Sequence, residues 1–266
     1  MAVNRQTLFL SHGGGPMPLL GDPGHQALVA QLEAMRTRLY KPAAIIVISA
    51  HWEDAVAAVT SGATPELIYD YNGFPPQAYE IQYPAPGLPE LAEDVHRLLQ
   101  DAGIASALKS NRGFDHGMFV PLKILFPKAD VPVIQVALLD HLDAETHLKL
   151  GRALSALQRD NVLLVGSGFS FHNMHAFYQS TPEADAHDAA FEGWLKETIC
   201  SADLNEEQRW QRLAQWEKAP SARFCHPREE HLLPLMVCYG YTQRACDYYD
   251  VVEVLGKHAG LFYWQS

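Results

Sequence analysis

Short runs of apolar residues alternate along the chain with longer segments in which apolar residues recur every three or four positions. The most apolar run, residues 43–49, contains the consecutive residues Ile45, Ile46, Val47 and Ile48. A run of this kind is typical of a strand that is buried on both faces, as in a parallel sheet. The pattern predicts strands over residues 7–10, 43–49, 131–138 and 161–165, and an edge strand over residues 261–264.

Segments with helical periodicity lie between these strands. In residues 24–40, Leu28, Leu32, Met35 and Leu39 share one face of a helix because they recur every three or four positions. The same pattern predicts helices over residues 24–40, 89–100, 144–158, 184–198, 206–216 and 229–238. Because strands alternate with helices, we predict a single α/β domain over residues 1–266, with helices on both faces of a mostly parallel or mixed sheet.

The composition is that of a globular protein. Apolar residues make up 48% of the chain and charged residues 19%, which argues against disorder. A formal net charge of -11 disfavours nucleic acids and anionic membranes as partners, because their phosphates would be repelled. No apolar run approaches membrane-spanning length and no signal-peptide pattern is present, so we expect a cytoplasmic protein. The four cysteines form no C-x-x-C pair, which disfavours a zinc knuckle or a thioredoxin-like site.

Several histidines lie at the ends of predicted strands. His12, His51 and His172 each follow such a strand, and α/β folds bind ligands beyond the carboxyl ends of their strands. Imidazole is the commonest metal ligand, so we expect these side chains to converge on one site. Each also has a structural interpretation, such as a cap on a glycine-rich turn for His12 or a hydrogen-bonded core residue for His51. Glu53 could supply a carboxylate ligand, but we interpret it as a helix-start residue.

His116 and His231 are further candidates. Asp115 precedes His116, and its carboxylate could orient the neighbouring ring; the alternative is a local Asp–His turn. His226 and His231 flank the start of a predicted helix, at a spacing that lets at most one of them face a common site. The acidic residues 229–230 are interpreted as part of a solvated first helical turn, where the helix dipole favours negative charge.

Other motifs carry less weight. A serine-hydrolase nucleophile elbow at Ser170 would need glycine at the position where His172 stands. The glycine-rich turn after His12 lacks the known phosphate-binding patterns. Residues 69–89, rich in proline and tyrosine, are expected to form an ordered loop. The remaining histidines are interpreted as surface or core residues: His25, His96, His141, His147, His175, His187 and His258.

A series of short motifs runs in order through residues 7–240. The motifs are residues 11–17 (SHGGGPM), 49–53 (SAHWE), 73–75 (GFP), 83–87 (YPAPG), 113–117 (GFDHG), 121–122 (PL), 166–168 (GSG), 172–173 (HN) and 230–235 (EHLLPL). Each motif is weak alone, but their order over nearly the whole chain is specific. In these motifs the chain resembles the class III extradiol ring-cleavage dioxygenases, in particular their 4,5-DOPA dioxygenase-like branch.

The resemblance implies a metal site in which the ligands are His12, His51 and His231. In protocatechuate-cleaving relatives the third ligand is a glutamate, so the neighbouring Glu230 is the alternative, and we follow the DOPA-type pattern in choosing His231. The resemblance also implies that His172 is an acid/base near the metal, which some metal-loaded forms use as a fourth ligand. Residues 168–171 are bulkier than the small-residue version of this segment that is typical of the family.

The implied activity is the opening of a catechol-type, DOPA-like ring by extradiol insertion of O2, which gives a muconic semialdehyde. His172 is expected to accept and return a proton, and His116 to stabilise charge on oxygen. Fe(II) is the expected active metal, because a facial triad leaves room for catecholate and O2, and zinc suits the same imidazoles in purified protein. The expected partners are a small catechol and O2, and a homo-oligomer is left open. The alternatives are a zinc-dependent hydrolase and a non-catalytic Memo-like binding protein.

Overall fold

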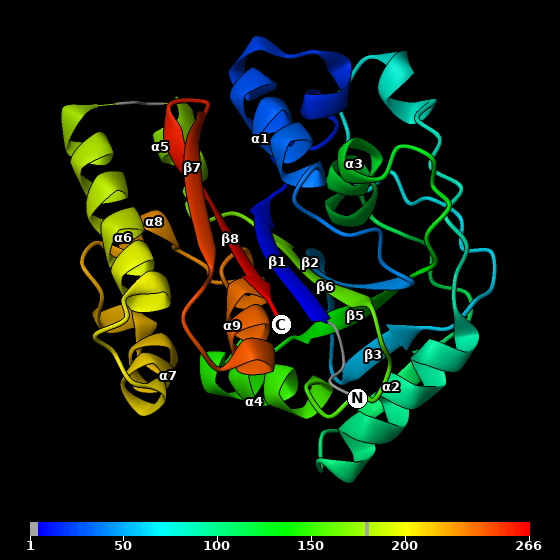
Figure 1. The fold of residues 1–266 in the computed structure, drawn as a ribbon. Coiled ribbons are helices and arrows are strands. Elements are labelled where there is room, and N and C mark those ends of the chain that lie inside the picture. The colour runs from blue at the N-terminus through cyan, green and yellow to red at the C-terminus, as the bar shows by residue number, and fades with distance from the viewer. Residues whose placement is uncertain (1–4, 179–180) are drawn as a thin grey trace.

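An eight-stranded mixed sheet crosses the protein in the part of the chain that the computed structural model describes, residues 5–178 and 181–266 (Figure 1). Its strands are β1 (Arg5–Ser11), β2 (Ala44–Asp54), β3 (Ala57–Thr60), β4 (Ser106–Lys109), β5 (Val133–Leu139), β6 (Val162–Gly168), β7 (Tyr248–Val254) and β8 (Lys257–Gln265). They lie side by side in the order β4-β3-β5-β2-β6-β1-β8-β7. The predicted α/β fold with a single mixed sheet is therefore confirmed.

The centre of the sheet is parallel. Strands β1, β6, β2 and β5 run in one direction, whereas β8 is antiparallel to β1 and β7 is antiparallel to β8. Ser11 of β1 pairs with Gly168 of β6, and Ser49 of β2 pairs with Ser167 of β6. The carboxyl ends of three strands therefore meet at one edge of the sheet, which is where parallel α/β folds bind ligands.

Helices cover both faces of this sheet. They are α1 (Gln26–Arg36), α2 (Pro89–Asp101), α3 (His116–Leu125), α4 (Ala144–Leu154), α5 (Met174–Tyr178), α6 (Pro182–Cys200), α7 (Glu206–Ala214), α8 (Ala222–Cys225) and α9 (Leu233–Thr242), with 3-10 turns η1 (Met17–Leu20), η2 (Pro23–His25), η3 (Pro76–Tyr79) and η4 (Trp216–Lys218). A Cβ at Gly166 would meet α9 at Pro234 O, whereas the next residue, Ser167, donates to Gly117 O of α3. Successive strand residues point to opposite faces, so α9 and α3 lie on opposite sides of β6. In the described residues, no helix has the length and apolar character that crossing a membrane requires.

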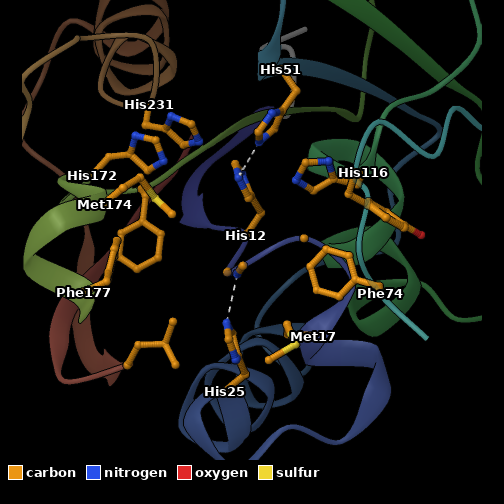
Figure 2. Close-up of a pocket in the computed structure, with 16 residues that line it drawn as sticks. His12, Met17, His25, His51, Phe74, His116, His172, Met174, Phe177 and His231 are labelled. Atoms are coloured by element: carbon orange, nitrogen blue, oxygen red, sulfur yellow. Dashed lines mark hydrogen bonds between the residues drawn. The ribbon is translucent and has the colours of Figure 1, made fainter.

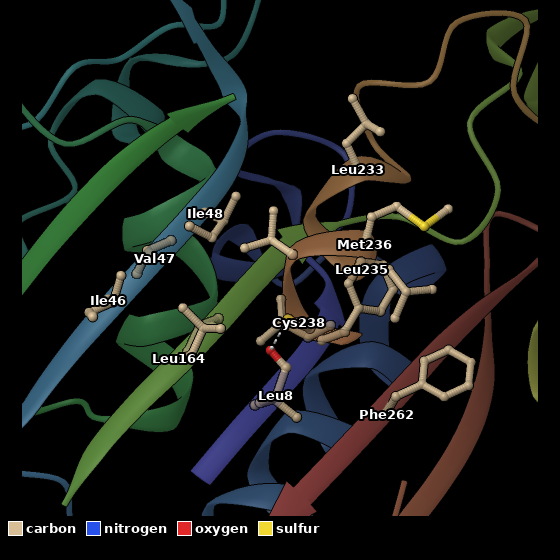
Figure 3. Packing of buried hydrophobic residues seen from close by; sticks show 14 of the residues in the cluster. Leu8, Ile46, Val47, Ile48, Leu164, Leu233, Leu235, Met236, Cys238 and Phe262 are labelled. Carbon is tan, nitrogen blue, oxygen red and sulfur yellow. Dashed lines mark hydrogen bonds between the residues drawn. The ribbon is translucent and has the colours of Figure 1, made fainter. Parts of the chain in front are cut away.

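The core between the sheet and α9 holds the start of that helix in place. Ile48 of β2, Leu164 of β6 and Leu235 of α9 are fully buried in it (Figure 3). Burying a side chain of this size stabilises the fold by about 1.5–3 kcal/mol. A Cβ at Gly168 would lie 2.1 Å from His231 O, so only glycine allows the turn before α9 to lie directly on β6. The position of His231 is therefore fixed by packing.

Two sequence-based predictions of element position are wrong. Residues 261–264 belong to β8, which pairs with β1 on one side and β7 on the other, and so are not at an edge. The helix expected over residues 229–238 begins only at Leu233, because Pro234 lacks a backbone N–H and suits the first helical turn. Strands β3, β4 and β7 were not predicted, since they are short or carry polar residues at many positions.

Residues 69–89 form the ordered loop that the sequence predicts. The Tyr69 hydroxyl donates a hydrogen bond to Ile81 O at 2.7 Å, and the Tyr71 hydroxyl donates one to Ala78 O at 2.6 Å. Tyr83 is only 2% exposed. These contacts fix the loop internally, and they hold Asp70 beside the carboxyl edge of the sheet.

Candidate active site

Histidines from distant parts of the chain gather at the carboxyl edge of β1, β2 and β6 (Figure 2). His12 follows β1, His51 lies in β2, His116 opens α3, His172 lies in the loop after β6, and His231 lies in the turn before α9. All of them line one cavity of about 340 Å³. The convergence of His12, His51 and His172 that the strand ends predict is thus present, and His116 and His231 join them.

His51 differs from the prediction in one detail. It does not follow the end of its strand, because β2 continues to Asp54. The pairing of β2 with β5 shifts register between Ile48 and Glu53, which is a bulge-like irregularity in the ladder. Such irregularities re-aim side chains near active sites. The local shift lets a residue inside the strand turn its ring toward the edge of the sheet.

His12, His51 and His231 are spaced as three ligands of one ion would be. Their ring centroids are 4.8 Å (His12–His51), 5.0 Å (His51–His231) and 5.3 Å (His12–His231) apart. Imidazoles whose nitrogens lie about 2.1 Å from a shared ion would have centroids roughly 4.5–5.3 Å apart. The Nε2 atoms of His12 and His51 are 2.9 Å apart, close to the separation of about 3 Å between adjacent ligand atoms of such an ion.

Each of the other two rings lies close against a member of this triad. His172 lies on His231 with the centroids 3.4 Å apart and the planes 17° from parallel. His116 lies 3.9 Å from His51 between centroids. Stacked rings present their nitrogens side by side instead of toward a common point, so His172 and His231 do not both suit one ion. His116 is tilted 43° from His51 and is not separated from the triad by this criterion. By ligand-atom distance alone, His12, His51 and His116 form one candidate group, and His172, Glu230 and His231 form a second.

Hydrogen bonds fix which nitrogen two of the triad rings, His12 and His231, offer. The Ser167 hydroxyl donates to Gly117 O and can therefore accept from His12 Nδ1, 3.0 Å away. The Glu230 carboxylate accepts from His231 Nδ1 at 2.8 Å. Both rings then carry an unprotonated Nε2, the form that binds metals.

Their surroundings keep the rings of His12, His51 and His231 uncharged. Burial is the largest cause that lowers the pKa of His12 and His51 well below the usual value, and repulsion between the rings adds to it. The same two causes lower the pKa of His231 to about 4. Neutral rings at neutral pH are the ligand form, so the donor set suits a cation such as Fe(II) or Zn(II).

Asp70, not Asp115, orients His116. The Asp70 carboxylate accepts hydrogen bonds from the backbone N–H and from Nδ1 of His116, both at 2.9 Å. Burial alone would raise the pKa of Asp70, but the bonds and charge of His116 hold it below its usual value. Asp115 is buried instead against Ser49 and Gln135. The expectation for Asp115 is wrong because its side chain points into the sheet, and no spacing rule could connect His116 with Asp70 in a distant loop.

Glu230 is buried, so the prediction of a solvated helical turn is wrong for this residue. Its Oε1 lies 2.8 Å from His231 Nδ1 and 3.1 Å from His172 Nδ1, on the side of both rings that faces away from the triad centre. Burial would raise the pKa of Glu230, yet its bonds to the two histidines hold it well below the usual range. Between the two ligand candidates that the sequence left open, this position favours His231.

Glu53 also differs from its predicted role. It lies in β2, and both of its carboxylate oxygens accept hydrogen bonds from Arg228 at 2.6 Å. Arg228 is also 3.3 Å from Glu230 Oε2. Arg228 therefore links Glu53, at the end of β2, to the turn that carries His231.

One further histidine, His25, lines the cavity without having been predicted as a site residue. His25 is fully buried, as a core residue would be, but it also lines the cavity. Its Nδ1 is 2.6 Å from Asp22 Oδ2, and its Nε2 accepts the N–H of Gly14 at 2.9 Å. A Cβ at Gly13 would lie 2.8 Å from the His25 ring, so the glycine turn and this ring are packed together. Only one of His226 and His231 reaches the cavity, as expected, because His226 Nε2 bonds to Ser170 O.

The fold and the site define an α/β protein with a histidine-rich candidate metal site, and comparison with known proteins identifies the family. The family model described as the catalytic LigB subunit of aromatic ring-opening dioxygenase matches residues 6–265. The chain belongs to this family and is an extradiol aromatic ring-opening dioxygenase.

Individual relatives agree with this assignment. The chain is 38% identical to Dioxygenase tasH of Hapsidospora irregularis, over 97% of this chain and 84% of the relative. It is 36% identical to 4,5-DOPA dioxygenase extradiol of Beta vulgaris, over 89% of this chain and 86% of that one. The crystal structure of an uncharacterized protein from Escherichia coli K12 superposes with a TM-score of 0.74 at 27% identity, covering 97% of this chain and 99% of the other. These matches favour the dioxygenase over the hydrolase and the Memo-like alternative.

Proposed function

We propose that His12, His51 and His231 hold Fe(II). A catechol that binds in the cavity beside them is then opened by extradiol insertion of O2. The observation that supports the ligand set is the even spacing of the three rings, with Nδ1 of His12 and of His231 each held by a hydrogen bond. Bound Fe(II) would supply open coordination positions and the redox chemistry that O2 requires. Both oxygen atoms end in the muconic semialdehyde and the catechol supplies the electrons, so the reaction needs no further reductant.

His172 is proposed as the proton carrier. It lines the cavity, and its Nδ1 lies 3.1 Å from the Glu230 carboxylate, which accepts that N–H and stabilises the ring when it becomes charged. Its Nε2 can then take a proton from a catechol hydroxyl and return it later in the reaction. Imidazole suits this role because one ring nitrogen can hold a proton while the other accepts and releases one.

His116 is proposed to stabilise negative charge that develops on oxygen. Asp70 accepts its Nδ1–H, and this carboxylate would stabilise the ring as a doubly protonated imidazolium, whose Nε2–H is then the group left for the reacting oxygen. A positioned polar group in a cavity with apolar walls acts more strongly on developing charge than it would in water. The wall residues Phe169 and Phe177 also exclude water from the reacting atoms.

A single experiment tests the proposed activity. Metal-free protein is loaded with Fe(II) without oxygen, and a panel of catechols that includes L-DOPA is added with O2. We expect a yellow ring-fission product and consumption of about one O2 per catechol. The same protein loaded with zinc is the control and should be inactive, since zinc has no redox chemistry. Metal uptake without ring opening, together with anaerobic ester hydrolysis, would instead favour the zinc hydrolase.

Replacing Asp70 by asparagine is expected to lower kcat for ring opening about 10- to 100-fold, because partners of this kind hold active-site imidazoles in place. The neutral amide no longer holds the His116 ring by a charged hydrogen bond, and it removes the carboxylate 3.9 Å from His51 Nδ1. Oxygen uptake and metal content are measured on the same samples. Asp130→Asn, at an exposed carboxylate paired with Lys41, is the matched control. A kcat that is equal in the two variants would contradict the role of Asp70.

A further inference from the structure

The walls of the cavity are apolar. Beyond the histidines, its surface is formed mainly by large hydrophobic side chains: Met17, Phe74, Phe169, Met174, Phe177 and Leu255. Figure 2 shows Met174 and Phe177 on one side of the space below the histidine cluster, Phe74 on the other, and Met17 with His25 at its far end. Among the described residues that line the cavity, none is Lys, Arg, Asp or Glu. A substrate ring bound at the cluster would extend its substituent along these walls.

Three polar groups near this space, those of Tyr71, Gly14 and Arg228, are already engaged. The Tyr71 hydroxyl donates to Ala78 O, and the Gly14 N–H donates to His25. Arg228, which contacts Glu230 behind the histidines, has its two terminal nitrogens on the Glu53 carboxylate. None of these groups is left to pair with a charged substituent.

The ionised groups that bond directly to the histidines of the cavity are carboxylates. Asp22 lies behind His25, Asp70 behind His116, and Glu230 behind His172 and His231. A carboxylate gives an anionic substituent no partner, and each of these carboxylates is covered by an imidazole that already bonds to it, so a cation would not reach it directly. A charge buried without a partner is strongly unfavourable.

From these contacts we propose that the preferred substrate is an uncharged catechol that carries a short apolar substituent, instead of a catechol acid or amino acid. This inference rests on the proposed function, since it assumes that the catechol ring binds at the histidine cluster. The cavity of about 340 Å³ is at the small end of ligand pockets, which span roughly 300–1,000 Å³, so the substituent is limited to a few carbon atoms. Each methylene buried against these walls strengthens binding by roughly three- to fourfold.

Binding to three catechols of equal length tests the proposal. 4-Propylcatechol, 3-(3,4-dihydroxyphenyl)propanoate and dopamine differ only in the last group of the side chain, which is a methyl, a carboxylate or an ammonium. Dissociation constants are measured by calorimetry without oxygen, on zinc-loaded protein that cannot turn the catechol over. We expect 4-propylcatechol to bind at least about tenfold more tightly than either charged compound, because a charge that enters the cavity loses its water without gaining a partner.

A variant adds the missing charge to the wall. Met174 is 50% exposed and lines the cavity, so Met174→Lys should fold and should place an ammonium beside the substituent. We expect the affinity for the carboxylate to rise at least about tenfold relative to that for 4-propylcatechol, since the carboxylate then has a partner. Leu108→Lys, at an exposed residue of β4 outside the cavity, is the matched control and should keep the preference of the native protein.

The outcomes separate this proposal from the proposed function. A charged catechol that binds as tightly as 4-propylcatechol to the native protein, or no binding by any of the three, would overturn the assignment of substrate class. If the neutral compound is preferred but the Fe(II) form with O2 leaves it unchanged, the substrate class is supported and the ring-opening function at this site is not.

Discussion

Protein in which His12 is replaced by alanine is expected to lose metal binding. After loading with Fe(II) or zinc and dialysis, native protein should retain about one ion per chain, whereas the variant should retain almost none. His12 is 2% exposed, its Nε2 lies 2.9 Å from that of His51, and its ring is near His231 as well. Its removal leaves two imidazoles, too few to hold the ion against water. The loss of affinity should exceed the 10- to 100-fold effect that is typical of residues behind the ligands.

The control for this prediction is another histidine. His141 is exposed and lies after β5, away from the cluster, so His141→Ala should keep the metal content and affinity of the native protein. Circular dichroism would be used to check that each variant is folded. If His12→Ala retained the metal at native affinity, the second candidate group, His172, Glu230 and His231, would become the binding set. His51→Ala distinguishes the two sets independently, because His51 belongs only to the first.

The sequence predicted those residues of the site that lie next to a recognisable local pattern, such as the end of an apolar strand or a short motif. His12 could be found because an apolar run ends next to it and the strand delivers its side chain to the edge of a parallel sheet. His231 could be found only from the EHLLPL motif, since the helix start was placed too early. Packing of the turn on Gly168, which decides where His231 lies, is a contact between distant segments and has no periodic signature.

The residues that orient the histidines could not be predicted for the same reason. Asp70 contacts His116 from a loop that has no regular hydrophobic pattern. Glu230 lies in a polar segment whose sequence indicates exposure to solvent, although its side chain is buried against His231. Burial strengthens the effect of these carboxylates, because hydrogen bonds and charge interactions with the neighbouring rings are stronger where water is excluded. Sequence patterning places polar residues on the surface by default, so it fails where a charge is buried for function.

Measuring the metal content of a variant also distinguishes His172 from the proposed ligands. Replacing it by alanine is expected to lower kcat for ring opening about 10²- to 10⁴-fold, the usual contribution of a positioned acid/base, while the metal content stays at the native level. Its ring is stacked 3.4 Å from His231 and is partly exposed to the cavity, so it lies beside the triad and not at a corner of it. Oxygen uptake on Fe(II)-loaded protein gives kcat, and elemental analysis of the same sample gives the metal content.

His175→Ala is the matched control for His172→Ala. His175 lies on α5 three residues later, is exposed, and does not line the cavity. Its replacement should change neither kcat nor metal content. If His172→Ala lost both activity and metal, His172 would be a fourth ligand, and the proton would have to be carried by another group. We expect His172→Ala to keep the metal and lose turnover. The hydrogen bond from Nδ1 of His172 to Glu230 orients the His172 ring as a base, whereas His231, which also bonds to Glu230, is the residue expected to bind the ion.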